Sequence, residues 1–316
     1  MPNNLLTVCI PSADPRFLAR TVDGLFENAA GEVEVIVSAD GYEPDLRPRQ
    51  GLTVLRHKRM GMRATLNAAR PHVRGGWYMK TDEHCLFAPG YDEILKADCG
   101  PRDVIIPRRY SLDAENWCIE RNPKGPRDAH YLSSPVWSIR ERHDYSINGL
   151  EWAQRTRALA KNWQGYDGPL AEDAVDETMS WQGSFYMMSR DQWEFIGPLE
   201  EKGWGSFASE PQVVGLMTQL SGGRLLLSKR CYYAHLYKGK RYGRGYRPNN
   251  DEIKAGHEFN AWYWMTDQWA GRSRNMRDFI EQWWPVPDWP ADTLERWDYY
   301  FPQGATLEQL KERARG

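Results

Sequence analysis

Long apolar runs, an excess of one charge and paired cysteines are all missing from this sequence of 316 residues. No stretch of about 18 apolar residues is uninterrupted, so we expect no membrane span. The N-terminal MPNNLLTVCIPSADP lacks the basic and apolar regions of a signal peptide. The 41 basic and 43 acidic side chains leave a net charge of -2, which argues against a nucleic-acid coat or a membrane-surface protein. Five scattered cysteines with no CxxC pair predict reduced thiols in a cytosolic protein, not a disulfide framework or a zinc knuckle.

Tryptophan is unusually frequent for its type in this sequence. Of the 15 tryptophans, seven lie between Trp262 and Trp297. Aromatic faces stack on sugars and bases, so this group could form a binding surface. A wedge of core aromatics that closes a domain explains the group equally simply, and for this group taken alone we favour that interpretation.

The first hundred residues alternate apolar strand patterns with helical ones. We expect strands at 5–11, 33–41, 52–57 and 76–82, and helices at 14–29 and 61–73. Continuous apolar strands separated by helices indicate a parallel sheet covered on both faces. Ligands of such sheets bind beyond the carboxyl ends of the strands. The polar residues at those ends are therefore predicted to meet at one rim: Ser12, Asp14, Asp40, His57, Arg59, Asp82 and His84.

The middle of the chain is harder to assign. Residues 107–166 are polar and rich in Arg and Asn, and we expect a long loop or lid there. A strand then precedes a helix that begins at Ser189, a further helix covers 209–223, and another strand lies within 223–239. The tail from Asn250 onward is predicted to be helical.

Seven motifs occur in the order in which GT-A glycosyltransferases carry them, and they cover roughly residues 5 to 238. They are TVCIPSADP, VIVSADG, RMGMRATLNAA, KTDEHC, WQGSFYMMSRDQWEFIG, GWGSFASEPQ and AHLYK. The chain resembles in particular the family 2 type and the polypeptide GalNAc- and galactosyltransferase-like modules, and its Trp-rich tail is closer to phage-encoded members. The resemblance implies an α/β fold of the GT-A (Rossmann-like) kind, with a mostly parallel sheet flanked by helices and a Trp-rich helical C-terminal extension.

The resemblance also implies a division of the chain. Residues 1–106 would form the nucleotide-sugar-binding half, and 107–240 the acceptor-side half of the same domain. Residues 241–316 would form the extension. If a phage encodes the protein, its location would be the host cytoplasm.

A metal site is predicted at Asp82 and His84. The two residues are two apart on an extended segment, so both side chains can face one ion. A carboxylate with an imidazole suits Mn²⁺ better than Mg²⁺, which we keep as the alternative cofactor. The family's motif is Asp-x-Asp or Asp-x-His, and the resemblance implies His235 as a third ligand, with Glu83 pointing away. A capped strand end with a solvated acid is the other interpretation, which the ordered motifs make the weaker one.

Five residues are predicted to bind the donor nucleotide. The resemblance implies Pro11 and Ser12 at the end of the first strand, and Asp40 as the acid that contacts uracil or ribose; Asp40 could instead form a turn. Arg59 and Arg63, around the first turn of a helix, could bind a diphosphate together with that helix N-terminus, or be solvated arginines.

A general base is the next requirement, because an inverting transfer needs a carboxylate to accept the proton of the acceptor hydroxyl. GWGSFASEPQ resembles the family's Trp-Gly-x-Glu-Asp/Asn region, with Glu210 as the nearest acid. Two or three residues intervene and Pro211 replaces the Asp or Asn, so Glu210 could instead begin a helix. The resemblance implies that Trp204, as a donor contact, and the loop 203–207 wall the sugar pocket. It also implies an acceptor side at Trp181, Gly183 and Ser184.

A basic run occupies residues 229–250. It holds seven Lys or Arg, five Tyr and no acid. Three uses stay open: a lid over the donor diphosphate, a surface for a DNA acceptor, and a solvated loop.

The sequence as a whole predicts a metal-dependent glycosyltransferase that uses a nucleotide-sugar, UDP-linked by preference. The acceptor would be a hydroxymethylated base in phage DNA, or else a glycan or protein. Two other classes stay as alternatives: an inactive nucleic-acid-binding protein on the same fold, and a carbohydrate-binding module built on the tryptophan-rich tail.

Overall fold

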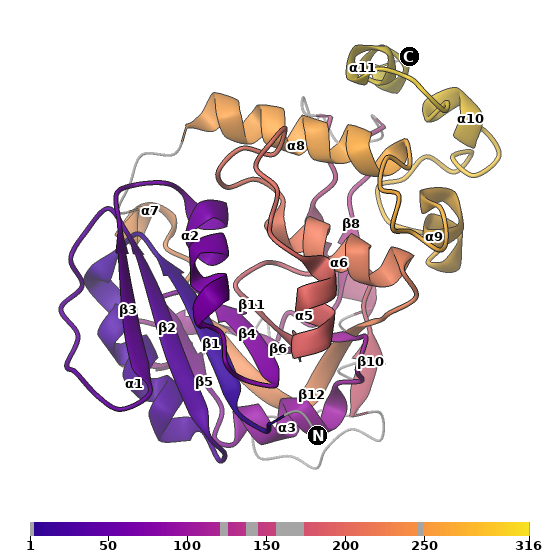
Figure 1. The fold of residues 1–316 in the computed structure, drawn as a ribbon. Coiled ribbons are helices and arrows are strands. Elements are labelled where there is room, and N and C mark those ends of the chain that lie inside the picture. Colours follow the sequence, from indigo (N-terminus) through magenta and orange to yellow (C-terminus); the bar gives the residue numbers. More distant parts are fainter. Residues whose placement is uncertain (1–2, 121–125, 137–144, 156–173, 245–248, 316) are drawn as a thin grey trace.

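The computed structural model describes residues 3–120, 126–136, 145–155, 174–244 and 249–315. Its centre is a mostly parallel sheet with the order β10-β12-β6-β11-β4-β1-β2-β3 (Figure 1). β1 runs parallel to β2 and β4, β2 to β3, and β12 to β6, whereas β11 is antiparallel to both of its neighbours. The strands of this path are β1 (Leu6–Ser12), β2 (Val33–Asp40), β3 (Leu52–His57), β4 (Trp77–Thr81), β6 (Val104–Asp113), β10 (Val175–Glu177), β11 (Phe185–Ser189) and β12 (Leu225–His235).

Helices cover both faces of the sheet, as the apolar strands require. On one face lie α1 (Leu18–Asn28) and α3 (Tyr91–Asp98), and on the other α2 (Met62–Ala69), α5 (Arg190–Ile196) and α6 (Glu210–Leu220) (Figure 1). Short 3-10 turns η1 (Pro15–Phe17) and η2 (Arg70–His72) adjoin α1 and α2. The expected α/β class and the strands and helices of the first hundred residues are confirmed.

Local sequence signals explain where these helices begin. The Asp14 side chain accepts a hydrogen bond from the Arg16 amide, with Pro15 in the first turn. Ser189 accepts one from the Gln192 amide, and α5 begins there as predicted.

The prediction of a long loop at 107–166 is wrong for much of the part of this segment that the structure describes. β6 runs to Asp113, and β7 (Cys118–Ile119), β8 (His130–Leu132) and β9 (Gly149–Glu151) follow. The polar composition hid β6 because its arginines are buried. Arg108 pairs with Asp128, and Arg109 donates to the Gln182 side chain. Residues 121–125, 137–144 and 156–166 lie outside the described part.

The C-terminal extension packs onto the same core. It contains α8 (Asn250–Met265), α9 (Met276–Gln282), α10 (Trp297–Tyr300) and α11 (Leu307–Arg315) (Figure 1). Trp264, Trp283, Trp289 and Trp297 are buried in the apolar cluster that also contains residues of α2, α5 and α6. The interpretation of this group as core aromatics is therefore confirmed. Among the described helices, none combines the length and apolar character of a membrane span.

Candidate active site and metal centre

A cavity of about 850 Å³ lies beyond the carboxyl ends of β1, β2, β4 and β12. Eleven of the residues that sequence motifs pointed to line it: Pro11, Ser12, Asp40, Arg59, Asp82, His84, Trp181, Gly183, Ser184, Glu210 and His235. Asp14 and His57 do not line it, although both lie at strand ends. The prediction of one shared rim is thus largely confirmed, because parallel strands bring their carboxyl ends to one edge.

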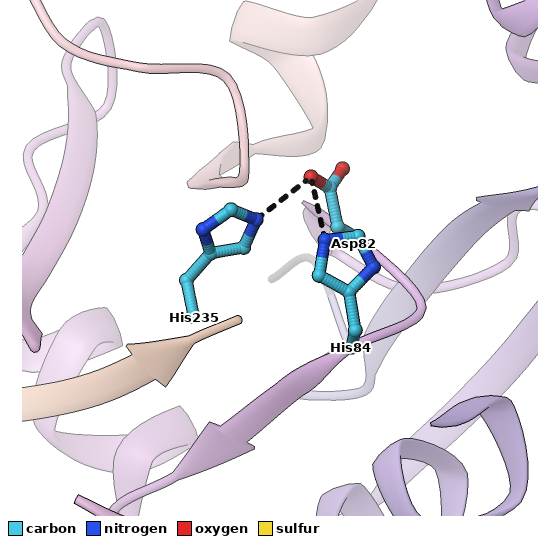
Figure 2. A group of neighbouring side chains, drawn as sticks. All are labelled: Asp82, His84 and His235. Atoms are coloured by element: carbon cyan, nitrogen blue, oxygen red, sulfur yellow. Dashed lines mark ion pairs between the residues drawn. The ribbon is translucent and has the colours of Figure 1, made fainter. Parts of the chain in front are cut away.

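Three side chains meet in this cavity as a candidate metal centre. Asp82 follows β4, His84 precedes β5 (Cys85–Phe87), and His235 ends β12. β5 pairs with β12 so that His235 lies opposite Cys85, which brings the two histidines together. One ligand atom from each of the three residues lies within 4.8 Å of the others. Figure 2 shows both imidazoles directed at Asp82.

The two carboxylate oxygens of Asp82 have different neighbours. Oδ1 accepts a hydrogen bond from Lys80 Nζ at 2.7 Å. Oδ2 lies 3.4 Å from His235 Nε2 and 4.0 Å from His84 Nε2 (Figure 2). Burial acts to raise the pKa of Asp82, but the Lys80 ammonium and the two imidazoles hold it well below its usual range. Asp82 is therefore anionic, with one oxygen directed at both histidines.

A second carboxylate lies behind His84. Glu83 Oε1 is 3.5 Å from His84 Nδ1 and accepts a hydrogen bond from Lys238 Nζ at 3.0 Å. Lys238 also donates to Asp14 Oδ2 at 3.1 Å, which links the ends of β1, β4 and β12. Metal-bound histidines commonly have such a carboxylate beside the ring nitrogen that does not bind the ion. Glu83 thus lies beside the ring nitrogen of His84 that does not face Asp82, where it would orient the imidazole of a metal-bound His84.

The chemistry of these donors fits a divalent cation. Burial lowers the pKa of His235 to about 4, so the imidazole is neutral, which is the form that binds metals. Its buried Nε2 lies 3.4 Å from Asp82 Oδ2 but makes no hydrogen bond with the residues that the structure describes. A buried polar atom without a partner is unfavourable, and an ion bound there would satisfy it.

Glu210 lies in the first turn of α6 and lines the cavity, with about 1% of its surface exposed. A Cβ atom on Gly183 would come within 2.6 Å of Glu210 Oε2, so glycine lets this acid approach the backbone. Burial raises the pKa of Glu210, although the charge of Lys80 and a hydrogen bond from Tyr186 oppose the increase. Within the described chain, its Oε1 is buried without a hydrogen-bond partner.

The carboxylate of Asp40 is already engaged. Its oxygens accept hydrogen bonds from the amides of Met60 at 2.6 Å and Gly61 at 3.2 Å. Arg59 Nη1 lies 3.9 Å from the same carboxylate. Asp40 therefore holds the turn before α2 against the end of β2, and it forms part of the cavity wall while doing so.

Arg63 and Trp204, two of the predicted donor contacts, lie elsewhere. Arg63 is fully buried and donates to the carbonyls of Glu200 and Ala208. Trp204 donates to the Asn260 side chain at 2.9 Å, and neither residue lines the cavity. The predicted diphosphate and sugar contacts are wrong for these two residues, because both are used in packing the segment between α5 and α6.

Most of the basic run that the structure describes is neutralised. Lys229 pairs with Asp176, Arg230 with Asp98, and Arg241 with Glu115. Lys238 pairs with two acids at the cavity edge, whereas Arg244 lines the cavity and lies over the Phe207 ring. The charge that a DNA backbone would need is thus largely compensated within the protein.

Sequence reasoning did not single out two residues of the site, Lys80 and Lys238, whereas Ser206 and Phe207 line the cavity within the loop 203–207 that was predicted to wall the sugar pocket. Lys80 could have been found, because positions 80 and 82 share one side of an extended segment. Met60, Phe207 and Tyr237 are three of the five large apolar side chains exposed in the described chain, and all three line the cavity. Exposed apolar groups gathered at a concave site are typical of ligand binding.

The sequence matches no protein-family model and no curated protein. Among solved structures, GalNAc-T7 with UDP, GalNAc and Mn²⁺ is similar at a TM-score of 0.53 and 14% identity, over 98% of this chain and 54% of that chain. S. aureus TarS matches at 0.43 and 12% identity, over 74% and 37% of the two chains. The mannosyltransferase PcManGT from Pyrobaculum calidifontis in complex with GDP-Man and Mn²⁺ matches at 0.43 and 12% identity, over 99% and 75%.

The chain spans about half the length of the GalNAc-T7 structure. The narrower resemblance to family 2 and to phage-encoded members stays a prediction. What the similarity does establish, together with the sheet order and the flanking helices, is the architecture: this chain has the GT-A fold of glycosyltransferases.

Proposed function

We propose that this protein is a metal-dependent glycosyltransferase that moves a sugar from a nucleotide-sugar to an acceptor hydroxyl. The observation that carries the proposal is the group of Asp82, His84 and His235 in one large cavity, with the buried acid Glu210 in the wall of the same cavity. A cation site and a separate carboxylate are the two parts that such a transfer needs.

Asp82, His84 and His235 would hold the cation, and Mn²⁺ suits this donor set best. When bound, the cation would supply positive charge to the diphosphate, which becomes more negative as the sugar departs. The GalNAc-T7 structure was obtained with UDP and Mn²⁺, which supports the choice of a UDP-linked donor. Pro11, Ser12, Asp40 and Arg59 would form the donor side of the cavity.

Glu210 would accept the proton of the acceptor hydroxyl as the new glycosidic bond forms. Its burial supports this role, because a raised pKa gives the carboxylate a greater affinity for that proton. Trp181, Gly183 and Ser184 would line the acceptor side next to it. Because the described basic run is mostly paired with acids, we propose a glycan or protein hydroxyl as the acceptor in preference to a modified DNA base.

A thermal-shift panel of UDP-, GDP-, TDP- and CMP-sugars, with and without Mn²⁺, tests the proposal. One nucleotide should raise the melting temperature only when the metal is present, because ligands stabilise the state that binds them. The variant His235→Ala should lose this metal-dependent increase while keeping the wild-type melting temperature in the absence of ligands. A flat panel would reject the enzyme assignment. Steeply salt-dependent binding of DNA with no donor effect would favour the nucleic-acid-binding alternative, and sugar binding without metal or nucleotide would favour a carbohydrate-binding module.

A further inference from the structure

Helix α8 belongs to the C-terminal extension, beyond the seven sequence motifs at residues 5–238. Its first turns nevertheless line the cavity, through Glu252, Ile253 and His257. Ile253 and His257 are four residues apart and so lie on one face of the helix, and Glu252 lies one position before that face begins. The extension is therefore part of the cavity wall.

The same face of α8 lies directly against the segment 203–209. A Cβ on Gly203 would come within 2.5 Å of the Phe259 ring, and one on Gly205 within 2.6 Å of Glu252 Oε1. On the helix side, a Cβ on Gly256 would collide with the Trp204 carbonyl. Glycine at all three positions allows helix and segment to approach more closely than side chains would permit.

Hydrogen bonds fix this contact at defined atoms. The Ser206 amide donates to Glu252 Oε1 at 2.6 Å, and this bond lowers the pKa of Glu252. Ser209 Oγ lies 2.8 Å from His257 Nδ1. Asn260 accepts the Trp204 indole hydrogen bond at 2.9 Å.

The held segment leads directly into Glu210. Ser209, the residue before it, has a φ of 57°, in the left-handed region that is unfavourable for a serine. The contact with His257 helps to keep Ser209 in this conformation, which aims the first turn of α6. On the other side, the Ser206 carbonyl accepts a hydrogen bond from the Arg63 amide at the start of α2. The segment is thus held between α2 and α8.

We propose that Glu252 and His257 are positioning residues of the active site: they hold residues 203–209 and thereby place Glu210. The inference rests on the proposed function for the role of Glu210. It makes the tryptophan-rich extension a necessary part of the enzyme and not a separate binding module.

The test uses the full chain and compares Glu252→Ala with Glu252→Gln and Asp251→Ala. Glu252→Ala should lower kcat at least tenfold and leave the donor KM within twofold, because a small displacement of a catalytic group is costly. Glu252→Gln keeps an oxygen that can accept the Ser206 amide bond, so it should recover most of the rate. Asp251→Ala removes the neighbouring exposed acid and should match the wild type. Ser209→Ala and His257→Ala should each lower kcat by the same factor, and the double variant should lower it no further, because both changes remove one shared contact.

Hydrogen exchange provides a readout that does not need activity. In Glu252→Ala and His257→Ala, the amides of 204–210 should exchange faster, while those of β1 and β4 stay as in the wild type. Unchanged exchange, or an unchanged kcat in an active enzyme, would overturn the positioning role. A wild-type chain with no transfer and no metal-dependent donor binding would reject the proposed function, and exchange alone would then decide whether α8 holds this segment.

Discussion

The variant Asp82→Ala tests two proposed roles of this carboxylate, as a ligand of the metal centre and as the ion-pair partner of Lys80. Lys80 has about 4% of its side chain exposed, and its ammonium bonds to Asp82 Oδ1 and to the Gly183 carbonyl. Removal of Asp82 leaves a buried positive charge that keeps its hydrogen bond to the Gly183 carbonyl and the attraction of the buried acid Glu210 but loses its direct ionic partner. Breaking a buried pair in this way costs about 3–5 kcal/mol. Because Asp82 itself is 26% exposed and water can enter in its place, we take the lower value of about 3 kcal/mol.

This cost converts into a melting temperature. At about 2.1 cal/mol/K per residue, the unfolding entropy of 316 residues is about 0.7 kcal/mol/K. A loss of about 3 kcal/mol therefore lowers Tm by about 4–5 °C in the metal-free protein. The double variant Asp82→Ala/Lys80→Met removes the unpaired ammonium together with its partner, so it should recover more than half of this decrease.

Scanning calorimetry with and without Mn²⁺ and the donor distinguishes the two roles. Both variants should lack the metal-dependent increase in Tm, whereas only the single variant should melt early without ligands. A double variant that regained the Mn²⁺ effect would refute the placement of the cation at Asp82. A single variant as stable as the wild type would refute the calculated cost of leaving Lys80 unpaired.

Three further predictions concern other parts of the molecule. Glu210→Gln should reduce transfer by about 10²–10⁴-fold. The same variant should be more stable than the wild type at pH 8, because burial raises the pKa of Glu210 and the wild-type chain loses folding free energy as the pH rises through that raised pKa. Below pH 4.5, the ordinary pKa of a glutamate, the two proteins should be equally stable, because Glu210 is then protonated in both the folded and the unfolded state. Glu83→Gln should weaken Mn²⁺ binding about 10–100-fold in titration calorimetry, because His84 loses its orienting carboxylate. Iodoacetamide should label one thiol of the native chain, that of Cys118, since the other four cysteines are buried.

Each of these three predictions has an outcome that would contradict it. Equal stability of Glu210→Gln and wild type at every pH would mean that Glu210 is solvated. For Glu83, the control is Glu115→Gln, which alters an exposed ion pair at Arg241; equal Mn²⁺ affinity in the two variants would remove Glu83 from the centre. Mass spectrometry showing more than one labelled cysteine in the native chain would contradict the buried state of the other four.

The first hundred residues could be predicted because their signals are local. β1 and β2 are almost entirely buried, and their continuous apolar runs follow directly from that. The spacing of Asp82 and His84 predicts that both face one ion, and the structure brings the two side chains together in the bend between β4 and β5 instead of on an extended segment. β6 could not be recognised, because the partners that make its buried arginines tolerable lie 20 and 73 residues away, at Asp128 and Gln182.

Arg63 and Trp204 illustrate the same limit within the site. Each has the residue type and motif position of a donor contact, yet Arg63 bonds to the Ala208 carbonyl 145 residues away and Trp204 to Asn260, 56 residues away. Lys238 is the reverse case, a residue of a basic run that joins two acids at the cavity edge. Whether a polar side chain is a ligand or a structural link depends on which distant groups satisfy it.

The sequence by itself determined most strands and helices of the first hundred residues and the rim where their strand ends meet, because burial and dihedral preference act over a few neighbouring residues. The family resemblance pointed to His235, but the tertiary structure was needed to place it beside Asp82 and His84. Only the tertiary structure decided that Lys80 occupies one oxygen of that carboxylate, and that α8 contacts the segment before Glu210. The physical reason is that hydrogen bonds and ion pairs between distant segments depend on how the folded chain brings those segments together. No local pattern encodes which partner a buried polar group will find.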